Sequence, residues 1–157
     1  MNRSITAASP RDVLARALDR VRAYDLEGFA DLFAEDGVID YPFAPAGALR
    51  RLQGREEIRR VLREAAAIPR RAGRRVTKIA SLVVHQTTDP ETIVAEFALE
   101  GEIVATGKSY RLPYIQVLRV RDGRIVSLRD YIDYPTLTAL TGGLPEPLAA
   151  GTARDPG

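Results

Sequence analysis

The spacing of apolar residues changes once along this chain of 157 residues. Up to about residue 67, apolar side chains recur at the three- and four-residue intervals of amphipathic helices. Ser9 and Pro10 offer a cap and a first-turn proline to one helix, and Asp25 can cap a second. The pattern predicts helices over 10–24, from 26 to about 35, and over 56–67, with a short strand over 38–43 and a loop over 44–54.

Beyond residue 76 the apolar interval falls to two, as in strands that are buried on one face. Asp122-Gly123 between two such runs is a strong hairpin signal. Helices followed by a meander of strands predict an α+β fold in one domain, 1–157. The strands are predicted over 76–88, 92–104, 108–121 and 124–133, followed by a short helical turn after Tyr134-Pro135, an ordered core over about 10–140 and a mobile tail over 142–157.

Asp130 is a charged exception on an apolar strand face. Alternate residues of a strand face opposite sides, so Val126, Leu128, Asp130 and Ile132 share one face. A buried carboxylate is costly unless it is paired, hydrogen-bonded or protonated. One interpretation is acid–base chemistry in a pocket, where desolvation raises the pKa of a carboxyl group. The other is a strand-end residue that pairs with a neighbouring arginine.

The two preceding strands supply the rest of this predicted apolar face. Gln116 is its polar exception, and it either orients a ligand or satisfies its strand neighbours. Tyr114 shares the face of Gln116, as a pocket residue or as core. Phe97 and Leu99 lie on the apolar face of the strand before.

Asp40, on the short early strand, has the parity of Val38 and is expected to face inward too. Its functional interpretation is again acid–base chemistry. Its structural interpretation is a role in the Tyr41-Pro42 turn.

Composition removes several classes of function. The chain has no cysteine and a single histidine, His85, which excludes disulfides, cysteine zinc sites and a Ser-His-Asp triad other than one built on His85. We therefore expect no metal and no cofactor. The 23 basic and 21 acidic residues give a net charge of +2, which is too balanced to predict nucleic-acid binding.

No apolar run approaches the roughly 20 residues of a membrane span, and residues 1–10 lack the apolar core of a signal peptide. The sequence therefore predicts a cytoplasmic protein with no membrane contact. Arginines are concentrated in residues 50–75. They are interpreted as a solvated helix face, with a basic rim for an anionic ligand or partner as the alternative.

The order of elements resembles the nuclear transport factor 2-like superfamily, which includes the SnoaL-like polyketide cyclases. Two stretches carry the resemblance. DLEGFADLFAEDG from Asp25, with DYP from Asp40, looks like the second helix and catalytic strand of ketosteroid isomerases. TGKSY from Thr106, DGRI from Asp122 and RDYID from Arg129 are similar to the closing strands of limonene-1,2-epoxide hydrolase. The resemblance implies a cone-shaped, mixed or antiparallel sheet wrapped around N-terminal helices that enclose an apolar pocket, and a homodimer.

In the isomerases, an aspartate on the first strand shuttles the proton, and Asp40 matches it. Their oxyanion hole uses a tyrosine and an aspartate whose positions fall at Ala17 and Gln116. In the hydrolases, Asp130 matches one aspartate of an Asp-Arg-Asp relay. The other relay members, and the tyrosine and asparagine that hold the water, fall at Phe97, Leu99, Ile39 and Tyr41. These replacements argue against either mechanism in its usual form.

The leading hypothesis is a cofactor-independent isomerase or cyclase that acts on a hydrophobic polyketide- or terpenoid-like small molecule. The alternatives are a non-catalytic ligand-binding domain of the same fold, and an epoxide hydrolase with an altered water site. The expected catalytic residues are Asp130 and Asp40, and the expected substrate-binding residues are Gln116, Tyr114, Phe97, Leu99, Tyr41 and Leu128.

Overall fold

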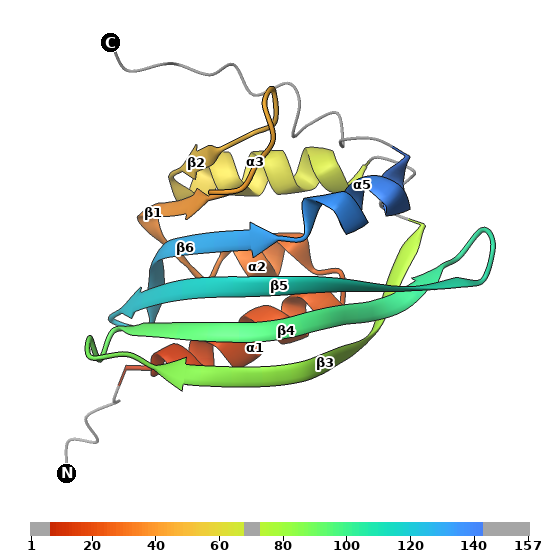
Figure 1. The fold of residues 1–157 in the computed structure, drawn as a ribbon. Coiled ribbons are helices and arrows are strands. Elements are labelled where there is room, and N and C mark those ends of the chain that lie inside the picture. The colour runs from red at the N-terminus through yellow and green to blue at the C-terminus, as the bar shows by residue number, and fades with distance from the viewer. Residues whose placement is uncertain (1–6, 68–72, 143–157) are drawn as a thin grey trace.

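A six-stranded sheet dominates the computed structural model, which describes residues 7–67 and 73–142 (Figure 1). The strand order is β2-β1-β6-β5-β4-β3, and every neighbouring pair is antiparallel except β1 and β6. The α+β fold with a curved, open sheet is therefore confirmed. The strands are β1 (Phe33–Asp40), β2 (Arg51–Gln53), β3 (Arg74–Gln86), β4 (Thr92–Ile103), β5 (Lys108–Arg121) and β6 (Arg124–Ile132).

The helices cover one face of this sheet, with α1 and α2 behind the long strands and α3 behind β1 and β2 (Figure 1). The predicted start of α1 is confirmed, because the Ser9 side chain accepts from the backbone N–H of Asp12 and Pro10 is the first helical residue. The short turn after β6 is helical as predicted. The helices are α1 (Pro10–Arg22), α2 (Leu26–Ala30), α3 (Arg55–Ala66) and α5 (Tyr134–Thr141).

The alternation predicted for β4 and β5 is confirmed. Leu112 and Leu118 of β5 are buried against the helices, whereas Arg111 and Arg119 are exposed on the other face. One detail of β6 is wrong. A bulge opposite Arg119 shifts the register, so that Ile125 rather than Val126 is fully buried.

The second helix is shorter than predicted, and β1 begins where that helix was expected to continue. Phe33 pairs with Ile125 of β6, and the Leu32 carbonyl accepts from the Ile125 N–H, so sheet pairing replaces helical bonds. Between Phe33 and Val38 the pairing with β6 is irregular. Gly37 lies in this irregular stretch, and a Cβ there would lie 2.8 Å from the Ile125 carbonyl oxygen. β1 also ends at Asp40 rather than at residue 43.

The loop predicted over 44–54 contains β2, which pairs with β1. Three residues are too few to show a strand period, so this strand was missed. The mobile tail predicted over 142–157 lies, beyond residue 142, outside the described residues.

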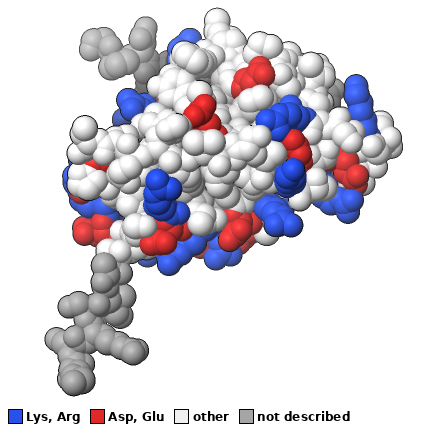
Figure 2. All heavy atoms as spheres, turned by 60° about the horizontal axis from the view of Figure 1, so that its bottom comes forward, with Lys and Arg blue, Asp and Glu red and all other residues white. Residues whose placement is uncertain are grey.

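On α3, Arg63 is exposed, as interpreted from the sequence, whereas Arg59 keeps only 19% of its side-chain surface exposed. Arg59 contacts Asp31 at 2.7 Å, Arg63 contacts Glu27 at 3.0 Å, and both acids lie on or beside α2. Basic and acidic side chains are likewise intermingled on the face of the molecule in Figure 2. Within the described ranges, no helix is long and apolar enough to cross a bilayer.

Candidate active site

An apolar cavity of about 150 Å³ lies between the helices and the inner face of the sheet. The first two helices contribute Ala17, Leu18, Val21, Leu26 and Phe29, and α3 contributes Leu62. Apolar cavities of about this volume hold ligands the size of benzene. The strand residues of the lining are Ile39, Tyr41, Phe97, Leu99, Tyr114, Gln116, Leu128 and Asp130.

Of the lining residues that the structure describes, Asp130 is the only charged one. It lies directly opposite Gln116 in the antiparallel pair of β5 and β6. The Gln116 Nε2 donates a hydrogen bond to Asp130 Oδ1 at 3.1 Å. The pair therefore forms the polar end of an otherwise apolar cavity.

Burial raises the pKa of Asp130 to about 7, and the hydrogen bond from Gln116 lowers it by a smaller amount. The residue as a whole keeps some accessible surface because it lines the cavity. Its carboxyl group nevertheless lies among apolar cavity walls, and desolvation there disfavours the charged form. A carboxyl group with such a pKa can both take and return a proton near neutral pH.

Phe97 and Tyr114 form one wall of the cavity. They are opposite each other on β4 and β5, and their rings stack with centroids 5.3 Å apart and an interplanar angle of 8°. Leu99 continues this wall, and Tyr41 and Leu128 lie on the strands β1 and β6 or at their ends. All six residues predicted to bind substrate therefore line one cavity, although their role in binding is a prediction.

Asp40 does not line this cavity, so its predicted inward orientation is wrong. Its carboxylate accepts from Arg51 Nη1 at 3.0 Å, and its side chain keeps 29% of its surface exposed. On β1 it is Ile39 that is buried, at 2% exposed. Asp40 does share the face of Val38, but that face is the outer one, because the buried residue between them is Ile39.

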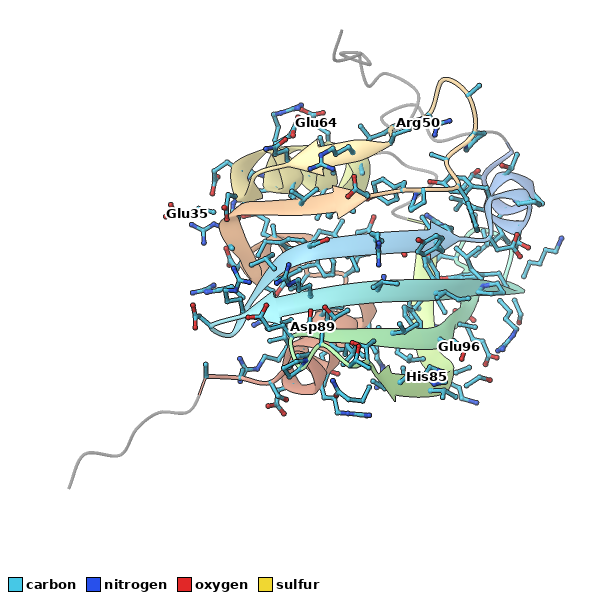
Figure 3. The ribbon with its side chains drawn as sticks, turned by 60° about the vertical axis from the view of Figure 1, so that its left-hand side comes forward. Glu35, Arg50, Glu64, His85, Asp89 and Glu96 are labelled. Carbon is cyan, nitrogen blue, oxygen red and sulfur yellow. The ribbon has the colours of Figure 1, made fainter. Side chains whose placement is uncertain are left out.

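His85 is exposed, as expected for a histidine near a strand end. Its Nε2 lies 2.6 Å from Glu96 Oε2, at the sheet edge formed by β3 and β4 (Figure 3). Over residues 7–67 and 73–142, no three His, Asp or Glu side chains gather into a group that could hold a metal ion.

Comparison with known proteins agrees with this architecture. Residues 14–128 match the sequence profile of the SnoaL-like domain. The chain belongs to the SnoaL-like family. It is 33% identical over 107 residues to the uncharacterised protein YesE of Bacillus subtilis, covering 68% of this chain and 69% of that protein. It is also 33% identical over 121 residues to an uncharacterised PhzA/B-like protein of Pseudomonas aeruginosa, covering 77% and 82%.

Solved structures share the fold. A candidate isomerase from Bacillus subtilis superposes with a TM-score of 0.75 at 28% identity, covering 85% of this SnoaL-like chain and 93% of that one. A candidate polyketide cyclase from Pseudomonas putida superposes with a TM-score of 0.65 at 20% identity, covering 86% and 99%. The predicted superfamily is confirmed, whereas the particular likeness to epoxide hydrolase or ketosteroid isomerase stays a prediction.

Proposed function

We propose that this SnoaL-like protein is a cofactor-independent isomerase or cyclase in which Asp130 moves a proton on a hydrophobic polyketide- or terpenoid-like molecule. The observation that carries the proposal is a carboxyl group with a pKa of about 7 at the polar end of an apolar cavity. Relatives described as candidate isomerases and polyketide cyclases support the class of reaction.

In the proposed reaction, the Asp130 carboxylate takes a proton from a carbon next to a carbonyl group. The C–H electron pair moves into the carbonyl to give an enolate. For an isomerase, Asp130 returns the proton to another carbon of the conjugated system. For a cyclase, the enolate carbon attacks a second carbonyl carbon, and Asp130 protonates the alkoxide that forms. Neither route consumes a further reactant.

Gln116 positions the carboxylate through its 3.1 Å hydrogen bond. Its amide carries a second N–H that is able to donate to a substrate oxygen. Tyr114 lies on the same face of β5, two residues before Gln116. Its hydroxyl is proposed to orient the same substrate oxygen. The apolar walls exclude water, which strengthens these interactions.

The test is Asp130→Asn, with Asp40→Asn as the matched control on the other face of the sheet. Exchange of carbon-bound protons is followed by NMR in deuterated water, over a panel of apolar polyketide-type and terpenoid ketones. Because a positioned acid or base accelerates a reaction by about 10²–10⁴-fold, Asp130→Asn should lower the exchange rate by at least 10²-fold. Asp40→Asn should exchange at the wild-type rate. Equal rates for wild type and Asp130→Asn would refute the proposal.

A non-catalytic binding domain is the second candidate, because among the described residues that line the cavity Asp130 is accompanied by no second charged group. Saturable binding of a panel ketone, with no exchange and no product, would favour it. An altered epoxide hydrolase is less favoured, since apolar Phe97 and Leu99 stand at the two relay positions. Incorporation of heavy-oxygen water into a diol would revive it.

A further inference from the structure

A second cavity of about 160 Å³ adjoins the Asp130 cavity. The two share the side chains of Val21, Leu26, Leu62, Leu99 and Tyr114 as walls. The second cavity runs along the inner face of β3, β4 and β5, away from Asp130. A substrate larger than a single ring would extend from the first cavity into the second.

A cationic side chain, that of Arg74, lines the far end of the second cavity. Arg74 begins β3 opposite Ile103 of β4, and it lines the cavity together with Val76. Its Nε is buried and donates to no acceptor among residues 7–67 and 73–142. Within the same residues Arg74 makes no ion pair. Buried polar groups are normally hydrogen-bonded, so this donor is an exception to be explained.

The adjacent residue shows the contrast. Arg75 points to the outer face, where it pairs with Glu102 on β4. The chain therefore supplies an acidic partner for the outward arginine and none, among the described residues, for the inward one.

Tyr110 brings a second polar group to the same end. It lies opposite Gly101 on β4 and lines the cavity. A Cβ at residue 101 would lie 2.0 Å from the Arg75 carbonyl oxygen and 2.8 Å from the Tyr110 hydroxyl, so glycine leaves room for the β3 backbone and for that hydroxyl. Burial raises the pKa of Tyr110, and the charge of Arg74 acts on it in the opposite direction, which places the two groups within each other's field.

We propose that Arg74 and Tyr110 bind the carboxylate of an elongated apolar acid whose body runs through the second cavity toward Asp130. This rests on the proposed function and narrows its substrate to a carboxylic acid. A guanidinium presents its Nε–H and an Nη–H side by side, which matches the two oxygens of a carboxylate. The Tyr110 hydroxyl is a further donor to the same group.

The ligand must be long. Arg74 pairs with Ile103, and Gln116 pairs with Ala95, eight residues away on β4. At a rise of about 3.4 Å per residue, the path along β4 between those positions is at most ~27 Å, and the curvature of the sheet shortens the direct distance. A molecule of three fused rings held at Arg74 exceeds the single-ring size that about 160 Å³ holds, so it would fill the second cavity and extend along the shared walls into the first.

The test uses two fluorescent probes of equal shape, anthracene-2-carboxylate and anthracene-2-carboxamide, titrated into the full-length protein. Arg74→Met loses the charge-assisted hydrogen bonds, so its affinity for the carboxylate probe should be about 10–100-fold lower than that of wild type. The amide should bind this variant as it binds wild type, which also shows that the variant is folded. Arg75→Met should bind both probes as wild type does.

Tyr110→Phe is the second variant, and it keeps the ring while removing the hydroxyl. This variant should bind the carboxylate probe several-fold more weakly than wild type and bind the amide probe with unchanged affinity. The proposal is overturned if Arg74→Met or, should that variant not fold, Tyr110→Phe binds the carboxylate with wild-type affinity. It is also overturned if wild type binds neither probe. Since these titrations measure affinity alone, either result leaves the Asp130 exchange assay to be judged separately.

Discussion

Asp40 and Asp130 lie on neighbouring strands, β1 and β6, and face opposite sides of the sheet. Asp40 pairs in register with Arg129, the residue just before Asp130. On the outer face Asp40 meets Arg51 and water, whereas on the inner face Asp130 meets Gln116 and apolar walls. One residue of register thus separates a partly exposed carboxylate that is ion-paired with Arg51 from a carboxyl group in an apolar cavity, whose burial raises its pKa to about 7.

Arg74 and Arg75, the first two residues of β3, also face opposite sides of the sheet, here with positive instead of negative charges. Arg75 is outward and paired, and Arg74 is inward with an unpartnered Nε among the described residues. In both cases, side-chain orientation decides whether the charge is neutralised by the protein. The unneutralised groups are both in the connected cavities, which is where a ligand would meet them.

The largest expected effect that distinguishes Asp130 from Asp40 is the pH dependence of the proposed reaction. If the carboxylate of Asp130 is the base, activity falls as pH drops through its pKa of about 7. Below that pH, each unit removes about nine-tenths of the remaining carboxylate, so kcat/KM at pH 5 should be ~100-fold below its value at pH 8. An ordinary aspartate pKa near 4 would instead give a flat profile over this range.

The same pH profile measured for Gln116→Leu tests whether Gln116 acts on the Asp130 carboxyl group. The hydrogen bond from Gln116 lowers the pKa of Asp130, so its loss should move the midpoint of the profile to higher pH. A midpoint that stays in place or moves down would show that Gln116 does not act through this carboxyl group.

A smaller effect is expected on stability, and its sign differs between the two aspartates. The folded pKa of Asp130 lies above the unfolded value near 4, so the folded state binds an extra proton between about pH 4 and 7. Its contribution is intact below pH 4 and is lost as pH rises through 7. Asp130→Asn should therefore raise the free energy of unfolding at pH 8, by at most about 4 kcal/mol at 1.36 kcal/mol per pKa unit.

Urea denaturation at pH 4.5 and pH 8 measures this difference. The stabilisation should be close to its full value at pH 8 and below about 1 kcal/mol at pH 4.5, where Asp130 is protonated in the folded wild type and only part of the unfolded-state ionisation remains. A gain that is equal at both pH values, or a loss at pH 8, would contradict burial as the cause. A variant that is more stable yet inactive would fit a functional site that is built at a cost in stability.

The sequence was informative where strands are long and regular. Alternation along β4 and β5 placed Phe97, Tyr114 and Gln116 on one face, and extension to β6 placed Asp130 beside them. This succeeds because a face buried against helices fixes the register, and a slip of one residue would turn every apolar side chain toward water.

The sequence was least informative where one residue had to identify the inward face of a strand. Parity correctly placed Asp40 on the face of Val38, but the inward residue there is Ile39, at 2% exposed. Arg74 shares the parity of Val76, which lines the second cavity, so alternation along β3 could have indicated that Arg74 faces inward. With two identical residues at the strand start, that signal rests on a single apolar neighbour.

The smallest expected effect is on the outer face. Asp40→Asn removes an ion pair with Arg51 in which the two side chains are 29% and 55% exposed. Exposed pairs contribute about 0.2–1 kcal/mol, and salt screens them. Asp40→Asn should therefore lower the free energy of unfolding at pH 8 by less than about 1 kcal/mol at low salt, and by less still in 1 M salt. A loss of several kcal/mol that persists in high salt would mean that Asp40 is as deeply buried in solution as Asp130, and the contrast between the two faces would fail.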